Sequence, residues 1–213
     1  GGYGAPAPGG YGAPAPGGYG GGVAPRDDYK RPFHKGGQHV LGRDRCPFYH
    51  KMGACRHGDR CTKVHDKPTS SRTIVLPMMF PNPKIVPIEI IRNGRKVQVE
   101  YDRKLLKKHI EEFYEDVFCT VMEFGRIVEM RVVDNLCEHM LGNVYIKFEN
   151  EVAAQNAVDG LNGKMYNGIL LLPELCPVSD FADAICKEVD DVTCKRGIQC
   201  NYWHPTPYPK SDS

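Results

Sequence analysis

The chain has 213 residues, a formal net charge of +2 and 25% charged residues, which fits one or two compact domains with flexible flanking segments. A net charge this close to zero gives no overall preference for nucleic acid or for membrane surfaces, so only the local charge pattern is informative. No apolar run reaches the roughly eighteen residues that a membrane-spanning helix needs, so no segment is expected to span a membrane.

Residues 1–42 are predicted to form a disordered N-terminal tail. The segment GGYGAPAP occurs twice, at residues 1–8 and 9–16. Such a composition buries too little apolar surface to offset the entropy lost on ordering. Residues 208–213 form a short tail at the other end.

A first zinc finger is predicted at residues 43–68. Its four candidate ligands are separated by eight, five and three residues: Cys46, Cys55, Cys61 and His65. Three thiolates and one imidazole make a closed tetrahedral Zn²⁺ site, which stabilises a small fold and leaves no position for catalysis.

The same pattern returns at residues 180–207, with spacings of seven, five and three: Cys186, Cys194, Cys200 and His204. Disulfides are the alternative, but they belong to secreted chains, and no apolar signal stretch lies near residue 1. We therefore expect two structural zinc ions. The three remaining cysteines, Cys119, Cys137 and Cys176, are expected to be reduced and inert.

The first finger has the composition of a single-stranded RNA site. Residues 43–67 contain seven Lys or Arg and three Asp. Between the ligands lie Phe48, Tyr49, Arg56, Arg60 and Lys63. Cations follow the phosphates and exposed rings stack on bases. One of the two rings is expected to pack on the zinc core instead.

A second pattern, at residues 72–177, predicts alternating strands and helices. Strands are expected at 73–76, 127–133, 144–148 and 169–172, and helices at 102–122 and 151–158. The first helix would begin at Asp102 as N-cap and carries an apolar stripe. An insertion at 81–99 contains two strands, 88–91 and 96–99, around the turn Asn93-Gly94.

The order βαββαβ is that of the ferredoxin-like RNA-recognition motif, so the fold class is α+β. The face that stacks bases in such motifs is poorly equipped here. Leu141 and Asn143 replace a base and an aromatic residue of the RNP1 pattern, and Val75 occupies the aromatic position of the neighbouring strand. Only Tyr145 is left for stacking, so we expect this sheet not to bind RNA.

Finger, modified RNA-recognition motif and finger, in this order, resemble the small subunit of the U2 snRNP auxiliary factor, a family of pre-mRNA splicing factors. The resemblance covers residues 43–207 and is carried by five segments: 53–61, 112–118, 134–136, 142–148 and 177–181. It implies binding of the AG at the 3′ splice site, a nuclear location in the spliceosome, and no catalysis. The alternative is a CCCH-finger adaptor in another step of mRNA processing or stability control.

By residue matching, the resemblance implies RNA contacts at Phe48, Arg56, Thr62 and Lys63 in the first finger, to which the composition adds Arg60. In the second finger it implies contacts at Lys195, Arg196 and Tyr202. Trp203, the only tryptophan, is expected to pack inside its small finger.

The resemblance also implies a heterodimer with the large subunit of the auxiliary factor. A tryptophan of that subunit would enter a pocket of the modified motif, called a U2AF homology motif, while acids of the first helix face basic residues. The acids are Glu111, Glu112, Glu115 and Asp116. The pocket motif reads Lys164, Met165 and Tyr166 in place of Arg, Trp and Phe, so an altered contact is expected.

Overall fold

The computed structural model describes residues 44–83, 88–92, 95–99, 103–188 and 194–207. Four predictions fall outside the described residues: the two tails, the turn Asn93-Gly94 and the N-cap Asp102. In the part of the chain that is described, no helix is long and apolar enough to cross a membrane.

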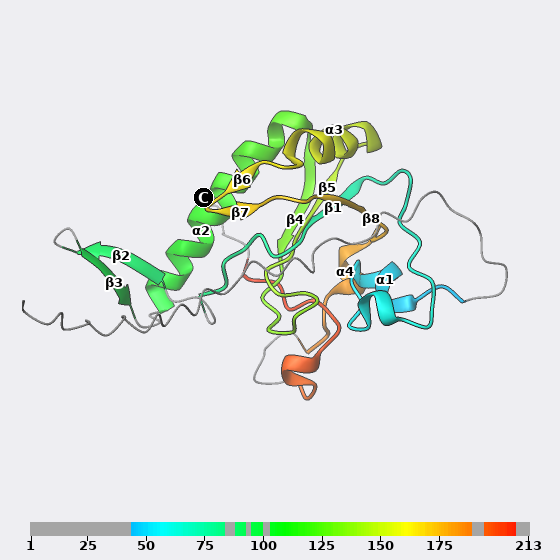
Figure 1. The fold of residues 1–213 in the computed structure, drawn as a ribbon, viewed down its shortest axis with the longest axis horizontal. Helices are drawn as coiled ribbons and strands as arrows, with labels where there is room; N and C mark the ends of the chain where they lie inside the picture. The colour runs from blue at the N-terminus through cyan, green and yellow to red at the C-terminus, as the bar shows by residue number, and fades with distance from the viewer. Residues whose placement is uncertain (1–43, 84–87, 93–94, 100–102, 189–193, 208–213) are drawn as a thin grey trace, which may run out of the picture. The chain divides into compact units, whose positions relative to one another are not determined.

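A four-stranded antiparallel sheet forms the centre of the fold (Figure 1). Its strands run in the order β4-β5-β1-β8, so β1 lies between β5 and β8. The bounds are β1 Thr73–Leu76, β4 Ile127–Val132, β5 Val144–Phe148 and β8 Glu174–Cys176. This order confirms the ferredoxin-like topology.

The predicted last strand was placed wrongly. Residues 169–172 do not join the sheet: Ile169–Leu170 (β7) pairs with Met165–Tyr166 (β6) in a separate hairpin. Asn167 and Gly168 both have positive φ, 46° and 79°, which closes a tight two-residue turn. The strand that pairs with β1 is instead β8, with Val75 opposite Glu174.

Two helices cover one face of the sheet. Helix α2 (Arg103–Val121) is followed by the short 3-10 helix η3 (Met122–Phe124), and α3 (Glu151–Leu161) ends three residues beyond the predicted Val158. The Asn150 side chain caps α3 by accepting a hydrogen bond from the Ala153 amide at 2.9 Å. The predicted stripe of α2 lies in the main core, with Leu106 only partly buried. Its buried members are Ile110, Phe113, Val117 and Val121.

The insertion forms the predicted hairpin. Strands β2 (Ile88–Arg92) and β3 (Arg95–Val99) pair with each other and with no other described strand. In this register Ile88 lies opposite Val99, and Arg92 lies opposite Arg95 beside the turn.

A second hydrophobic cluster covers the other face of the sheet, and both fingers contribute to it. Met52 comes from α1 (Pro47–Met52) of the first finger, whereas Phe181 of α4 (Phe181–Ala184) and Trp203 belong to the second. All four residues of β1 are buried as a result. An antiparallel sheet commonly leaves one face in water, and this one leaves neither.

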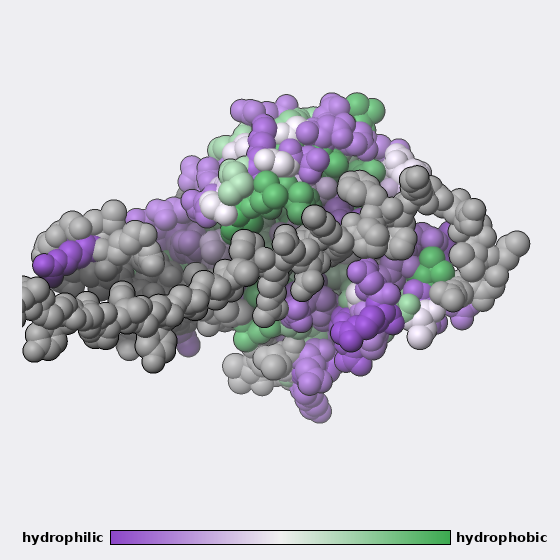
Figure 2. All heavy atoms as spheres, in the orientation of Figure 1, coloured by the Kyte–Doolittle hydropathy of each residue, from purple (hydrophilic) through white to green (hydrophobic). Residues whose placement is uncertain are grey.

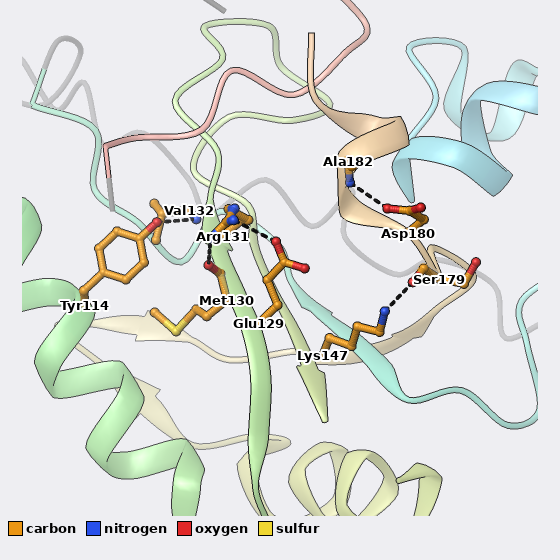
Figure 3. A network of polar contacts seen from close by, with 9 residues as sticks. All are labelled: Tyr114, Glu129, Met130, Arg131, Val132, Lys147, Ser179, Asp180 and Ala182. Atoms are coloured by element: carbon orange, nitrogen blue, oxygen red, sulfur yellow. Dashed lines mark hydrogen bonds and ion pairs between the residues drawn. The ribbon is translucent and has the colours of Figure 1, made fainter. Parts of the chain in front are cut away.

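Polar contacts fix the second finger to the sheet (Figure 3). Lys147 of β5 donates a hydrogen bond to the Ser179 carbonyl at 2.6 Å, directly before α4. The Asp180 side chain then caps α4 through the Ala182 amide. On the other side, the Tyr114 hydroxyl of α2 accepts from the Val132 amide at 3.0 Å.

Candidate nucleic-acid interface

The first finger brings its four predicted ligands together. The ligand atoms of Cys46, Cys55, Cys61 and His65 all lie within 4.8 Å of one another. Cys55 Sγ and Cys61 Sγ are 3.8 Å apart. A tetrahedron with Zn–S bonds of about 2.3 Å has edges of about 3.8 Å, whereas a disulfide is about 2.05 Å long. The distance therefore fits a shared metal ion and excludes a disulfide.

The second finger repeats this geometry. Cys186 Sγ lies 3.9 Å from Cys194 Sγ and 3.8 Å from Cys200 Sγ, and His204 completes the group within the same 4.8 Å limit. Both ligand sets thus fit a structural Zn²⁺, which would cross-link the segments that carry the four ligands.

Matching backbone contacts explain why the two spacings agree. In each finger the residue before the first cysteine bridges the residue before the histidine: Arg45 pairs with Val64, and Ile185 with Trp203. The amides of Cys46 and Cys186 each donate to the carbonyl of that partner at 2.9 Å. A 3-10 helix precedes the third cysteine in both, η2 at Gly58–Arg60 and η4 at Gly197–Gln199. These repeated turns require the same C-x5-C-x3-H interval.

The predicted RNA side chains of the first finger lie at its surface, all five exposed: Phe48, Arg56, Arg60, Thr62 and Lys63. Tyr49 differs, because its ring stacks on ligand His65 with centroids 4.7 Å apart and planes 11° apart. Phe48 is 37% exposed. The expected division, with one ring on the zinc core and one at the surface, is confirmed.

In the second finger, Lys195 and Arg196 are exposed and Tyr202 is half-buried. The surface around η4, at the bottom of the view in Figure 2, is hydrophilic. Arg196 also has a structural contact: its Nη2 donates to the Cys186 sulfur at 3.3 Å. The pKa of Arg196 is raised, and this hydrogen bond to the Cys186 sulfur is the largest cause. The guanidinium lies 5.2 Å from the centre of the Tyr202 ring, so it links the metal-binding cysteines to this half-buried ring.

The sheet face that stacks bases in other RNA-recognition motifs is closed. Tyr145, the one remaining platform ring, is fully buried and stacks on Trp203 with centroids 4.0 Å apart. Burial raises the pKa of Tyr145 far above its usual range. The prediction that this sheet does not present bases with a stacking surface is confirmed, for a reason that the sequence did not reveal.

The expected role of Trp203 needs correction. It is buried, but it packs between the domains rather than inside its small finger. Its ring contacts Tyr145 and Phe181, and its Nε1 donates to the Met52 carbonyl of the first finger at 2.9 Å. One side chain therefore joins the sheet, the first finger and the second.

The first finger makes its own close contact with the sheet at Gly53. This residue has a φ of 70°, and a Cβ there would lie 2.6 Å from Cys176 Sγ and 2.9 Å from the Tyr145 ring. Only glycine fits both the conformation and the space. Cys176 is buried in this contact, which raises the pKa of its thiol to about 12 and keeps it protonated. Cys137 is also partly buried, whereas Cys119 is exposed.

Asn143, which replaces an RNP1 aromatic, is a structural residue. Its Oδ1 accepts from the Met78 amide at 3.1 Å, and its Nδ2 donates to the His139 carbonyl and to the Tyr145 hydroxyl, both at 3.3 Å. It is only 5% exposed. At the position of the RNP1 aromatic residue, this chain therefore has a junction of three hydrogen bonds.

Sequence reasoning missed the loop between β4 and β5 as a support of the second finger. Asn135 Nδ2 donates to the carbonyls of Cys200 and Tyr202 at 3.2 and 2.9 Å, and its Oδ1 accepts from the His204 amide at 2.7 Å. This side chain is 4% exposed. An asparagine in a polar loop is an ordinary turn signal, so nothing in the local pattern marks its long-range role.

His139 of the same loop is half-buried. Burial, the largest cause, lowers its pKa, and the charges of Arg56 and His57 act in the same direction. The loop contacts the second finger through Asn135.

Three of the four predicted partner acids on α2 are exposed: Glu112, Glu115 and Asp116. Glu111 and Glu112 form ion pairs with Lys107 and Lys108 at 3.3 and 3.4 Å. Of the pocket motif, Lys164 lies 5.9 Å from the centre of the Phe124 ring, and Met165 is 62% exposed.

Tyr166 connects the pocket motif to α2. Its ring meets Phe113 edge-on, with centroids 5.8 Å apart. Burial, with a hydrogen bond to Asp116 as the second cause, raises the pKa of Tyr166 well above its usual value. The structure thus places the motif beside the acidic half of α2.

Comparison with known proteins gives two family matches and a set of relatives. The profile described as zinc finger C-x8-C-x5-C-x3-H type (and similar) matches residues 41–67, and the RNA recognition motif profile matches residues 114–171. The chain is 41% identical over 165 residues to the splicing factor U2AF 23 kDa subunit of Schizosaccharomyces pombe, covering 76% of this chain and 72% of that protein.

Two further relatives have similar identities. The splicing factor U2AF 26 kDa subunit of Mus musculus is 40% identical, with 78% of this chain and 74% of the relative covered. The splicing factor U2af 38 kDa subunit of Drosophila melanogaster is 40% identical, and the match covers 76% of this chain but only 61% of that longer protein.

Proposed function

This chain belongs to the U2AF small-subunit family of splicing factors, and from this we propose that it is a nuclear protein that recognises the AG of a 3′ splice site through its two fingers. We further propose that it pairs with the large subunit of the auxiliary factor through α2 and the β6–β7 hairpin. Two structural zinc ions hold the fingers.

The observation that supports RNA recognition by the fingers is the closed sheet. Since Tyr145 is buried under Trp203, no ring on this face is left for base stacking. The fingers present exposed groups suited to RNA: Phe48 offers a ring, and Arg56 and Lys63 offer charge. The proposed contacts are Phe48, Arg56, Arg60, Thr62 and Lys63 in the first finger, and Lys195, Arg196 and Tyr202 in the second.

The loop that supports the second finger favours one composite RNA site over two separate ones. Asn135 fixes the backbone beside ligands Cys200 and His204, and Trp203 fixes the first finger through Met52. Two fingers held in this way bind adjacent nucleotides without a further loss of orientational freedom, which raises their combined affinity.

For the large subunit, the proposed surface consists of the α2 acids and the pocket motif: Glu111, Glu112, Glu115, Asp116, Lys164, Met165 and Tyr166. A buried aromatic anchor would supply the affinity and the acids would orient a basic peptide. Glu115 and Asp116 are exposed, and Asp116 lies beside Tyr166. Because Met165 lacks an aromatic ring, we expect weak binding.

A titration with short RNAs tests the RNA proposal. The zinc-loaded chain is added to a labelled uridine-rich RNA with one AG, and to the same RNA with AG replaced by CC, and fluorescence anisotropy is recorded. We expect at least tenfold tighter binding of the AG sequence, about 1.4 kcal/mol. Equal affinity for both sequences would reject AG recognition and favour the adaptor function.

Variants locate the site within the fingers. Phe48→Ala should weaken AG binding by about 1–3 kcal/mol if the ring stacks on a base, and Arg56→Ala should weaken it without loss of folding. Arg72→Gln, an exposed cation outside the fingers, serves as the control and should bind like the parent. Unchanged affinity in both finger variants would remove the first finger from the site.

A further inference from the structure

The charges of α2 are separated along the helix. Its first six residues include Arg103, Lys104, Lys107 and Lys108 and no acid, while residues 109–123 contain five acids and no Lys or Arg. All four of these cations are exposed. The positive segment extends backwards into the hairpin, since residues 92–108 hold seven Lys or Arg against two acids.

Helix stability does not explain this arrangement. The positive end of the helix dipole favours acids in the first turn, with about 0.3–1 kcal/mol for each, and α2 has none there. The two ion pairs Lys107–Glu111 and Lys108–Glu112 have the lysine on the N-terminal side, which is the weaker orientation for an i,i+4 pair.

The hairpin shows a similar unfavourable placement. Arg92 and Arg95 are directly opposite each other in the β2–β3 register, and like charges in that position destabilise a strand pair. Arg95 is exposed. The hairpin tip and the start of the helix therefore both accept a local electrostatic cost of the same sign, and only three residues separate the end of β3 from the start of α2.

We infer that these residues form a basic arm, defined as Arg92, Arg95, Lys96, Arg103, Lys104, Lys107 and Lys108, that binds the phosphate backbone of single-stranded RNA outside the nucleotides read by the fingers. This inference rests on the proposed RNA-binding function. RNA fits this charge because it is the polyanion that the fingers are proposed to bind, and a transcript continues on both sides of a short recognition site. Phosphate contacts add affinity without sequence preference.

The test compares two RNAs that share the AG core. One ends close to the core, and the other carries uridine extensions on both sides. The arm variant is Arg103→Gln/Lys104→Gln, which leaves both lysine–glutamate pairs in place, and the hairpin variant is Arg92→Gln/Arg95→Gln. The matched control, Arg72→Gln/Arg126→Gln, removes the same charge from exposed positions outside the arm and the fingers. Affinities are measured by anisotropy over a series of salt concentrations.

We expect the arm variant to bind the extended RNA at least roughly tenfold more weakly at 0.1 M salt, and to lower the slope of log affinity against log salt by about 1.4, or about 0.7 per phosphate contact. The hairpin variant should act in the same direction. The short RNA and the control should show parental values.

Two results would overturn the inference. If both variants bind the extended RNA with parental affinity and salt slope, the arm does not contact RNA, and an acidic protein surface becomes its better partner. If they lose the same factor on both RNAs, the effect is not a contact with the extensions. A parent that shows no AG preference, but still binds the extended RNA more tightly and loses this gain in the arm variant, would reject the proposed AG recognition and support the arm.

Discussion

Replacing Trp203 by alanine should destabilise the sheet and both fingers together. The side chain is fully buried, stacks on Tyr145 at 4.0 Å, and donates to the Met52 carbonyl at 2.9 Å. Truncating a buried tryptophan costs about 3–5 kcal/mol, and a buried carbonyl left without its donor adds about 1–3 kcal/mol. Together these contributions predict a loss of about 4–8 kcal/mol, a large part of the about 5–15 kcal/mol that a domain has in total.

The assay is guanidinium denaturation with excess zinc, followed by circular dichroism because the variant has no other tryptophan. Trp203→Phe is the matched variant: it keeps an aromatic ring against Tyr145 and loses the Nε1 donor, so about 1–3 kcal/mol should be lost. A loss within about 0.5 kcal/mol in Trp203→Ala, as for ordinary surface substitutions, would refute a shared core between fingers and sheet.

Further predictions concern the metal, the supporting loop and the partner. Removing zinc with a chelator should expose Trp203, shift its fluorescence to the red and abolish RNA binding, with recovery on adding Zn²⁺; an unchanged spectrum at zero bound metal would contradict the metal-dependent fold. Asn135→Ala should cost about 1–3 kcal/mol of stability and speed zinc release from the second finger, while Leu136→Ala, next to it and 38% exposed, should not; equal rates would contradict the support role. Met165→Trp should tighten a tryptophan-containing basic peptide of the large subunit by about tenfold, measured by calorimetry; no gain would place the peptide elsewhere.

The zinc ligands and most strands could be predicted because each is determined by local sequence. Ligand spacing follows from the metal's geometry, and Val144–Phe148 is apolar enough to specify a strand by itself. The last strand could not be assigned in this way. Ile169–Leu172 and Glu174–Cys176 are both short, and only the pairing of β8 with β1 distinguishes them.

The role of Trp203 was beyond sequence reasoning for a related reason. A tryptophan next to a metal ligand suggests packing within its own finger, and its actual contacts, Met52 and Tyr145, lie 151 and 58 residues away in the sequence. The sequence correctly predicted that the sheet offers no base-stacking surface, because Val75 and Asn143 occupy positions of aromatic residues. The burial of Tyr145 became evident only from the packing.

The three hydrogen bonds of Asn143 have an evolutionary consequence. A stacking ring cannot be regained at this position by a single change, because an aromatic side chain would remove the partners of the Met78 amide, the His139 carbonyl and the Tyr145 hydroxyl at once. Even then Trp203 would still cover the neighbouring ring. A covered sheet therefore cannot easily return to base stacking. Descendants of this fold are expected to gain new RNA contacts at their edges and insertions instead.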